Sequence, residues 1–125
     1  MPRHFENELK DLKASLLAMA GQVEEMIALT REAYSERSDT KADQVSTLDQ
    51  GVDQLELRLD QACIDLLALR APFASDLRLI ASTLKIVPTL ERIGDHCTNI
   101  AEEIHFLVTG EQLPTERPKV DALNT

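Results

Sequence analysis

Apolar residues recur every three or four positions along most of the chain, and this spacing constrains the fold more than any other feature. Alternating steps of three and four keep apolar side chains on one face of an α-helix and are typical of helices packed in a bundle. The first series runs through Leu9, Leu12, Leu16, Met19, Val23, Met26, Thr30 and Ala33. It predicts a long helix over about residues 3–36.

A second series follows a short polar connection, SERSDTKAD, in which Asp39 or Thr40 is a candidate N-cap. This series consists of Val45, Leu48, Val52, Leu55, Leu59, Ala62, Leu66 and Leu69. It ends before Pro72, which disfavours helical geometry in the preceding residue and suits the first turn of a new helix. Because this connection is so short, the second and third helices are expected to run antiparallel.

The third helix is expected over about residues 73–109, with Gly110 as its terminator. Its apolar stripe shifts phase at Pro88, which removes one helical hydrogen bond and predicts a kink rather than an end. The residues expected to be buried are Leu77, Ile80, Leu84, Val87, Leu90, Ile93, Cys97, Ile100, Ile104 and Leu107. The predicted fold class is therefore all-α, an antiparallel three-helix bundle. Residues 1–112 form one domain, and residues 113–125, with two prolines, form a tail.

Composition and charge argue against several classes of protein. Twenty-two acidic residues against thirteen basic ones give a formal net charge of -9, and phosphate recognition in nucleic acids needs a basic surface. No stretch approaches the ~20 apolar residues of a membrane span. The charged start, MPRHFENELKDLK, is not that of a signal peptide. Cys63 and Cys97 fall within helical patterns, as expected of small core residues in a reduced, cytoplasmic protein.

Two of the predicted helices carry a row of acids directly beside the apolar series. Asp49 and Asp53 are four residues apart on the second helix. Glu91 and Asp95 are four apart on the third. Asp53 and Glu91 are about equally far from the connection between these helices, so antiparallel packing places both pairs at similar height. Four carboxylates there, with the amide of Asn99 one turn on, suit Fe, Mn, Mg, Ca or Zn.

The acidic row on the second helix continues through Glu56 and Asp60, and such rows also occur on ordinary solvated helix faces. A metal-free helical bundle that only binds partner proteins is therefore one alternative. A di-metal carboxylate enzyme of the helical-bundle type is another, but it needs two Glu-x-x-His motifs. The chain offers one candidate, Glu102 with His105, near the end of the third helix.

Three parts of the chain together match a known family pattern. They are HFENELKDLKASLLAMAGQVEEMI, TLDQGVDQLELRLDQACIDLL, and APFASDLRLIASTLKIV followed closely by LERIGDHCTNIAE. They resemble the PhoU family of bacterial phosphate-signalling regulators over about residues 4–112. The most specific part of the match is the run through Glu91, Arg92, Gly94, Asp95 and Asn99.

The resemblance implies a metal site and a set of partners. PhoU proteins are three-helix repeats, usually two per chain, that bind multinuclear iron or zinc clusters through paired E(D)xxxD motifs; manganese is a further candidate here. In this chain the motifs correspond to Asp49, Asp53, Glu91 and Asp95. The family represses the phosphate-starvation response by contacting the ATPase of a phosphate ABC transporter and a phosphate-sensing histidine kinase. The resemblance therefore implies a negative regulator of phosphate uptake that catalyses no reaction.

Two features depart from the family pattern. The chain carries a single repeat, whose third helix is more similar to the family's second repeat than to its first. The chain is therefore expected to be either half of a longer protein or a one-repeat form. A one-repeat form would pair with another copy, so we expect a homodimer or higher oligomer. We expect this protein to be peripheral to the membrane at most. The second departure is Pro88, which is unusual one turn before the metal motif and affects the geometry of the site.

Overall fold

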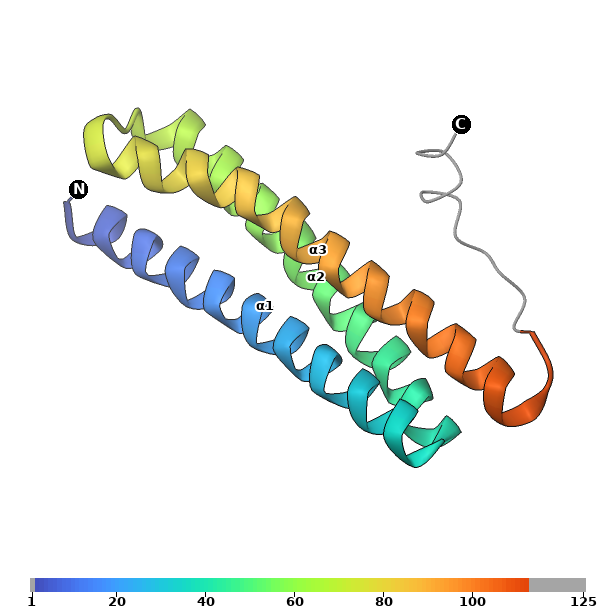
Figure 1. Ribbon diagram of the computed structural model, residues 1–125. Helices are drawn as coiled ribbons and strands as arrows, with labels where there is room; N and C mark the ends of the chain where they lie inside the picture. The colour runs from blue at the N-terminus through green and yellow to red at the C-terminus, as the bar shows by residue number, and fades with distance from the viewer. Residues whose placement is uncertain (1, 113–125) are drawn as a thin grey trace, which may run out of the picture.

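The computed structural model describes residues 2–112, which contain three α-helices and no strand. The helices are α1 (Pro2–Glu36), α2 (Asp39–Arg70) and α3 (Ala74–Thr109). Figure 1 shows them in one bundle, in which α2 is antiparallel to both α1 and α3. The predicted all-α three-helix bundle is confirmed. The predicted tail, 113–125, lies outside the described residues.

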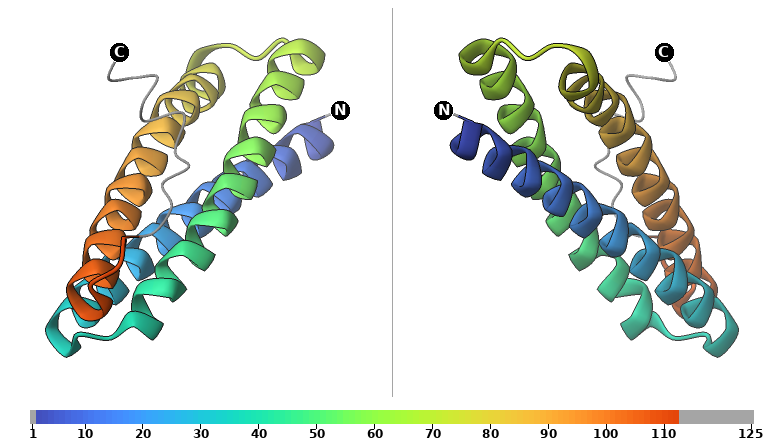
Figure 2. Two further views of the ribbon diagram at one scale, coloured as in Figure 1. Left: turned by 90° about the vertical axis from the view of Figure 1, so that its right-hand side faces the viewer. Right: turned by 90° about the vertical axis from the view of Figure 1, so that its left-hand side faces the viewer.

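The two connections lie at opposite ends of the bundle, and the N-terminus lies at the same end as the α2–α3 connection (Figure 2). At the start of α2, the backbone N–H of Lys41 donates to Ser38 Oγ at 3.1 Å. The N-cap is therefore Ser38, one residue before the predicted candidates Asp39 and Thr40. Asp39 instead lies in the first turn, where its negative charge complements the helix dipole.

Left-handed residues end α2 and α3. Ala71 follows α2 with a φ of 44°, and α3 then begins at Ala74, two residues after Pro72. At the other end of α3, the predicted terminator Gly110 adopts a φ of 77°, a conformation that glycine takes at little cost. Its N–H donates to the carbonyl of Phe106 at 2.8 Å and so satisfies one of the last helical carbonyls.

The apolar series of α1 and α2 form the core largely as predicted. On α1 every predicted position is buried except Leu16, which is half-buried. On α2 the predicted positions up to Leu66 are buried or half-buried, but Leu69, in the last turn, is 71% exposed. Cys63 and Cys97 are buried with free thiols, as predicted.

On α3 the predicted phase shift is wrong. Ile93, Ile100 and Leu107 were expected in the core but are 37%, 48% and 44% exposed, and Leu77 is also exposed. The buried residues are Ile80, Thr83, Val87, Gly94, Cys97, Thr98, Ala101 and Ile104. With half-buried Leu90, these positions keep the steps of three and four on both sides of Pro88. From Gly94 to Ala101 small side chains thus take the buried positions, whereas Ile80, Val87 and Ile104 bury larger ones.

Pro88 lies within α3 and does not end it. Its side chain is exposed, so its ring faces away from the core and the buried series continues past it. The kink expected at this position stays a prediction. None of the helices in residues 2–112 combines the length and the apolar composition that crossing a membrane requires.

Candidate metal centre

Antiparallel packing of α2 against α3 brings the two acidic rows together in one groove, which we call the acidic groove. Four contacts between α2 and α3 define how the two antiparallel helices are aligned. In each contact the number of the α2 residue and the number of the α3 residue add up to 143 or 144. These contacts join Cys63 to Ile80, Asp53 to Glu91, Asp49 to Gly94 and Asp39 to His105. The register is therefore constant along the groove, and residues of the two rows face each other turn by turn.

Three carboxylates in the acidic groove form a compact cluster. One oxygen from each of Asp53, Glu56 and Glu91 lies within 4.8 Å of the other two. Over residues 2–112, this is the one group of acidic, histidine or cysteine side chains that meets this spacing. Two oxygens bound to one cation at ~2.3 Å lie at most about 4.6 Å apart, so small side-chain movements suffice to hold a hard cation. The donor set therefore fits a metal ion.

The cluster contains two of the five predicted ligands and one residue that the prediction did not include. Glu56 belongs to the acidic row, but it lies three residues after Asp53, whereas the predicted motif pairs acids four residues apart. Side chains three apart on a helix are neighbours as surely as those four apart. The spacing therefore makes Glu56 a neighbour of Asp53, although it does not define the approach of Glu56 to Glu91.

The other predicted ligands lie in the same groove but outside the cluster. Asp49 approaches α3 closely, because its Oδ1 lies 3.5 Å from the position that a Cβ would take at Gly94. Asp49, Asp53 and Asp95 each have one carboxylate oxygen that is almost inaccessible to solvent. Asn99 is half-buried, two turns along α3 from Glu91. Grouping negative charges away from water is costly, and a bound cation offsets this cost.

The thiols of Cys63 and Cys97 are buried and do not belong to the carboxylate cluster. Burial raises the pKa of Cys63 to about 11, and the charge of Asp60 contributes further. Burial also raises the pKa of Cys97, with a partly opposing hydrogen bond from Thr30. The donors of the cluster are therefore carboxylate oxygens, which favour hard cations.

Glu102 and His105, the candidates for a di-metal enzyme, do not belong to the cluster. His105 Nδ1 lies 2.6 Å from Asp39 Oδ1, a hydrogen bond that joins the end of α3 to the start of α2. One ring nitrogen is thus engaged in holding two helices together. The geometry therefore gives the enzyme interpretation no support.

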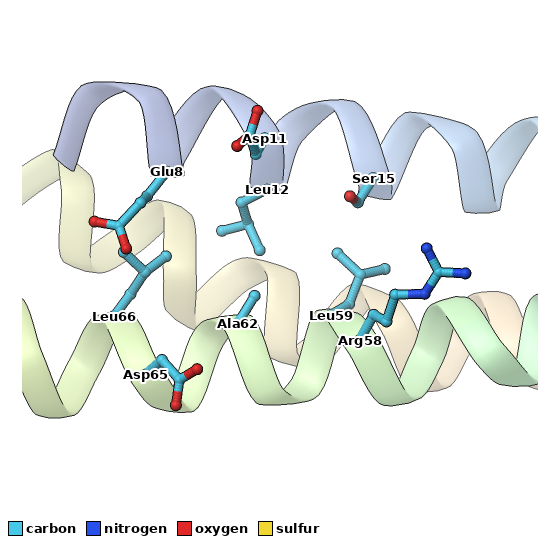
Figure 3. A pocket seen from close by; sticks show the side chains of 9 residues that line it. All are labelled: Glu8, Asp11, Leu12, Ser15, Arg58, Leu59, Ala62, Asp65 and Leu66. Atoms are coloured by element: carbon cyan, nitrogen blue, oxygen red, sulfur yellow. The ribbon is translucent and has the colours of Figure 1, made fainter. Parts of the chain in front are cut away.

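The groove between α1 and α2, which we call the mixed groove, differs from the acidic groove. It forms a hollow of about 230 Å³, where Leu12 and Leu59 point toward each other (Figure 3). At one end Arg70 Nε donates to Glu8 Oε1 at 2.8 Å. The remaining lining residues are Asp11, Ser15, Arg58, Ala62, Asp65 and Leu66. Its exposed acids, Asp11 and Asp65, lie among basic and apolar residues.

Comparison with known proteins identifies the family. The PhoU domain model matches residues 16–104, most of the bundle and both acidic rows. The chain belongs to the PhoU domain family. It is 43% identical over 99 residues to a phosphate-specific transport system accessory protein PhoU homolog from Pseudomonas putida, covering 79% of this chain and 39% of the relative. The homolog from Aquifex aeolicus is 40% identical over 100 residues, covering 80% and 45%.

The PhoU fold is also seen in a solved structure. The crystal structure of PhoU from Pseudomonas aeruginosa is similar with a TM-score of 0.81 and 37% sequence identity. The similarity covers 95% of this chain and 57% of that protein. The predicted resemblance to the PhoU family is therefore confirmed. The chain spans somewhat less than half of the length of the two curated relatives.

Proposed function

We propose that this chain is an accessory regulator of a phosphate-specific transport system and that it binds metal ions in the acidic groove. The match of the PhoU domain model to residues 16–104 carries the proposal. The curated relatives are named accessory proteins of that transport system. In this role the chain acts in the cytoplasm, catalyses no reaction and represses phosphate uptake. Its proposed partners are the transporter ATPase and a phosphate-sensing histidine kinase.

The proposed metal site is built from carboxylates on two helices. Asp53, Glu56 and Glu91 hold the first ion, since their oxygens already lie within 4.8 Å of one another. Asp49 and Asp95, one turn along the groove, extend the site toward a multinuclear iron, zinc or manganese cluster, with Asn99 as a further oxygen donor. A bound cation neutralises part of the acidic charge and links α2 to α3. The proposal also includes self-association into a homodimer or higher oligomer.

The metal site is tested by removing two of its charges. The chain is stripped with a chelator, dialysed, and titrated separately with Mn²⁺, Zn²⁺ and Fe²⁺, with metal content measured by mass spectrometry. Wild type should bind at least one ion per chain. Asp53→Asn combined with Glu91→Gln should weaken binding at least a hundredfold and leave the helical content unchanged, because neither residue is in the buried core.

A matched control removes the same charge elsewhere. Asp11→Asn combined with Asp65→Asn changes two exposed acids of the mixed groove and should leave metal binding as in wild type. If the acidic-groove variant binds metal as tightly as this control, the proposed ligands are wrong.

The regulatory role is tested in cells. The chain is expressed in a bacterial strain that lacks its own PhoU and carries a reporter of the phosphate-starvation response. With ample phosphate, the chain should repress the reporter. A reporter that stays fully active despite normal amounts of the chain contradicts the regulatory role, whatever the outcome of the metal titration.

A further inference from the structure

The groove between α1 and α3, which we call the apolar groove, exposes large apolar side chains at regular intervals. On α3 the residues lie seven apart along the helix and are 37–48% exposed. On α1 two further residues, also seven apart, are 50% and 65% exposed. The set comprises Ile27, Tyr34, Ile86, Ile93, Ile100 and Leu107. Residues seven apart lie on the same side of a helix, so these side chains form a continuous stripe along the bundle.

The stripe has the features of a helix-binding surface. At one end it widens into a hollow of about 460 Å³ lined by Tyr34, Ile100, Glu103, Ile104, Phe106 and Leu107. Single exposed apolar residues are common on soluble proteins, but a contiguous patch marks an interaction site. A seven-residue interval is the one at which two helices packed at a small angle meet repeatedly. The occupant is therefore expected to be another helix.

We infer that this helix is α3 of a second copy of the chain, packed antiparallel about a twofold axis near Cys97. This inference rests on the proposed self-association and assigns it to one face. The twofold axis brings Ile86 of one copy to Leu107 of the other and Ile93 to Ile100. Each contact occurs twice, as in an isologous dimer. The hollow beside Leu107 then receives Ile86 of the second copy.

The charges on the exposed side of α3 favour this antiparallel arrangement. Lys85 and Arg92 are exposed in the part of the stripe nearer the start of α3. Glu103 is exposed in the part nearer its end, and Glu111 lies just beyond the helix. Antiparallel pairing places Arg92 close to Glu103 of the second copy. Parallel pairing instead places each charge beside its own counterpart, which is unfavourable.

The size of the stripe is adequate for a dimer. From Ile86 to Leu107 it spans ~31 Å at ~1.5 Å per residue, and two helices are ~20 Å wide. The face therefore covers about 600 Å² per copy, close to the ~800 Å² per partner of a standard interface. The acidic groove lies on the other side of α3, so it stays open and the two acidic surfaces stay apart.

Sedimentation equilibrium of the full chain tests the interface. Wild type should be a dimer at tens of micromolar. Ile100→Glu and Ile86→Glu should each weaken dimerisation at least a hundredfold, with unchanged circular dichroism, because both side chains are about half exposed. Leu57→Glu is the matched control, because Leu57 is 69% exposed on α2, away from this groove. A monomeric wild type, or a control as monomeric as the groove variants, overturns the inference.

A charge exchange tests the antiparallel orientation. Arg92→Glu and Glu103→Arg should each weaken the dimer about tenfold, and the double variant should restore it. Failure of the double variant to recover overturns the antiparallel pairing. The interface and the metal site can fail separately. For Ile100→Glu, a monomer that still binds metal supports the interface, whereas a variant that stays dimeric overturns it. A wild-type dimer that binds no metal refutes only the metal site.

Discussion

The two sides of α3 differ sharply although their residues are neighbours in sequence. Ile93 and Asp95 flank Gly94, yet Ile93 belongs to the apolar groove and Asp95 to the acidic groove. The buried line between the two grooves holds small residues in this part of α3, including Gly94 and Ala101. Between residues 93 and 101, α3 thus exposes the bulky Ile93 and Ile100 and buries smaller side chains. A helix built in this way presents two different binding faces.

Each face is energetically unfavourable in the isolated bundle, and a different kind of ligand stabilises each one. The acidic groove holds carboxylates close together and partly away from water, which a cation offsets. The apolar groove keeps large side chains in contact with water, which a second apolar surface offsets. Covering the exposed part of each stripe residue contributes about 1 kcal/mol. Part of this gain is lost to the entropic cost of association.

The largest expected effect comes from placing a large side chain at Gly94, in the buried part of α3 between the two grooves. Gly94→Leu should lower the free energy of unfolding by about 2–3 kcal/mol, because the added side chain must displace tightly packed atoms. A Cβ at Gly94 already lies 3.5 Å from Asp49 Oδ1 and from the sulfur of Met26. Urea denaturation measures the change. Ile93→Ala, one position away, should lower the free energy of unfolding of the monomer by less than about 1 kcal/mol, because Ile93 is partly exposed. Equal losses of stability in the two variants would contradict the assignment of Gly94 to the core.

A smaller effect is expected at alkaline pH, from the buried thiol of Cys63 on α2, which faces α3. The Cys63 thiol donates to the carbonyl of Ile80 at 4.0 Å, and burial raises its pKa from 9.0 to about 11. The folded state therefore retains a proton that the unfolded state releases, so this contribution is complete below pH 9 and is lost as the pH rises through about 11. Denaturation between pH 8 and 11 should show this loss in wild type. Cys63→Ala should flatten the curve over that range, and Ile100→Glu should not; an unchanged slope in Cys63→Ala refutes the assignment.

The smallest effect is expected outside both grooves. Gly21 is exposed on α1, and no atom outside its own helical turn lies within 4 Å of an added Cβ. Gly21→Ala should therefore raise the free energy of unfolding by at most about 1 kcal/mol, the difference in helix propensity. Thermal denaturation measures the gain. Metal uptake and dimerisation should stay as in wild type, and a change in either shows that the two faces are not confined to the grooves assigned here.

The sequence predicts α1 and α2 well because their cores are made of large apolar residues at regular steps. It fails on α3 after Pro88 because hydrophobicity favours Ile93 and Ile100, whereas burial follows the small residues Gly94 and Ala101. Nothing in the hydropathy of a glycine marks it as a core position. Only the packing of α3 against α1 and α2 shows that the row with Gly94 and Ala101, and not the adjacent row with Ile93 and Ile100, faces the core.

The candidate site was predictable where it depends on helix register. The short connection between α2 and α3 is sufficient to place Asp53 opposite Glu91. The inclusion of Glu56 was within reach from its spacing to Asp53, but its approach to Glu91 depends on side-chain conformations that the spacing does not define. Likewise, the hydrogen bond between His105 and Asp39 joins residues far apart in sequence, and it became visible only in the folded bundle.

The central claim is that α3 divides two functions between its two sides, metal binding in the acidic groove and self-association through the apolar groove. Native mass spectrometry of the metal-loaded chain tests this directly, because one spectrum counts both chains and metal ions. Wild type should appear as a dimer with metal on each chain, Asp53→Asn with Glu91→Gln as a dimer without metal, and Ile100→Glu as a monomer with metal. Loss of both metal and dimer in either variant would contradict the division.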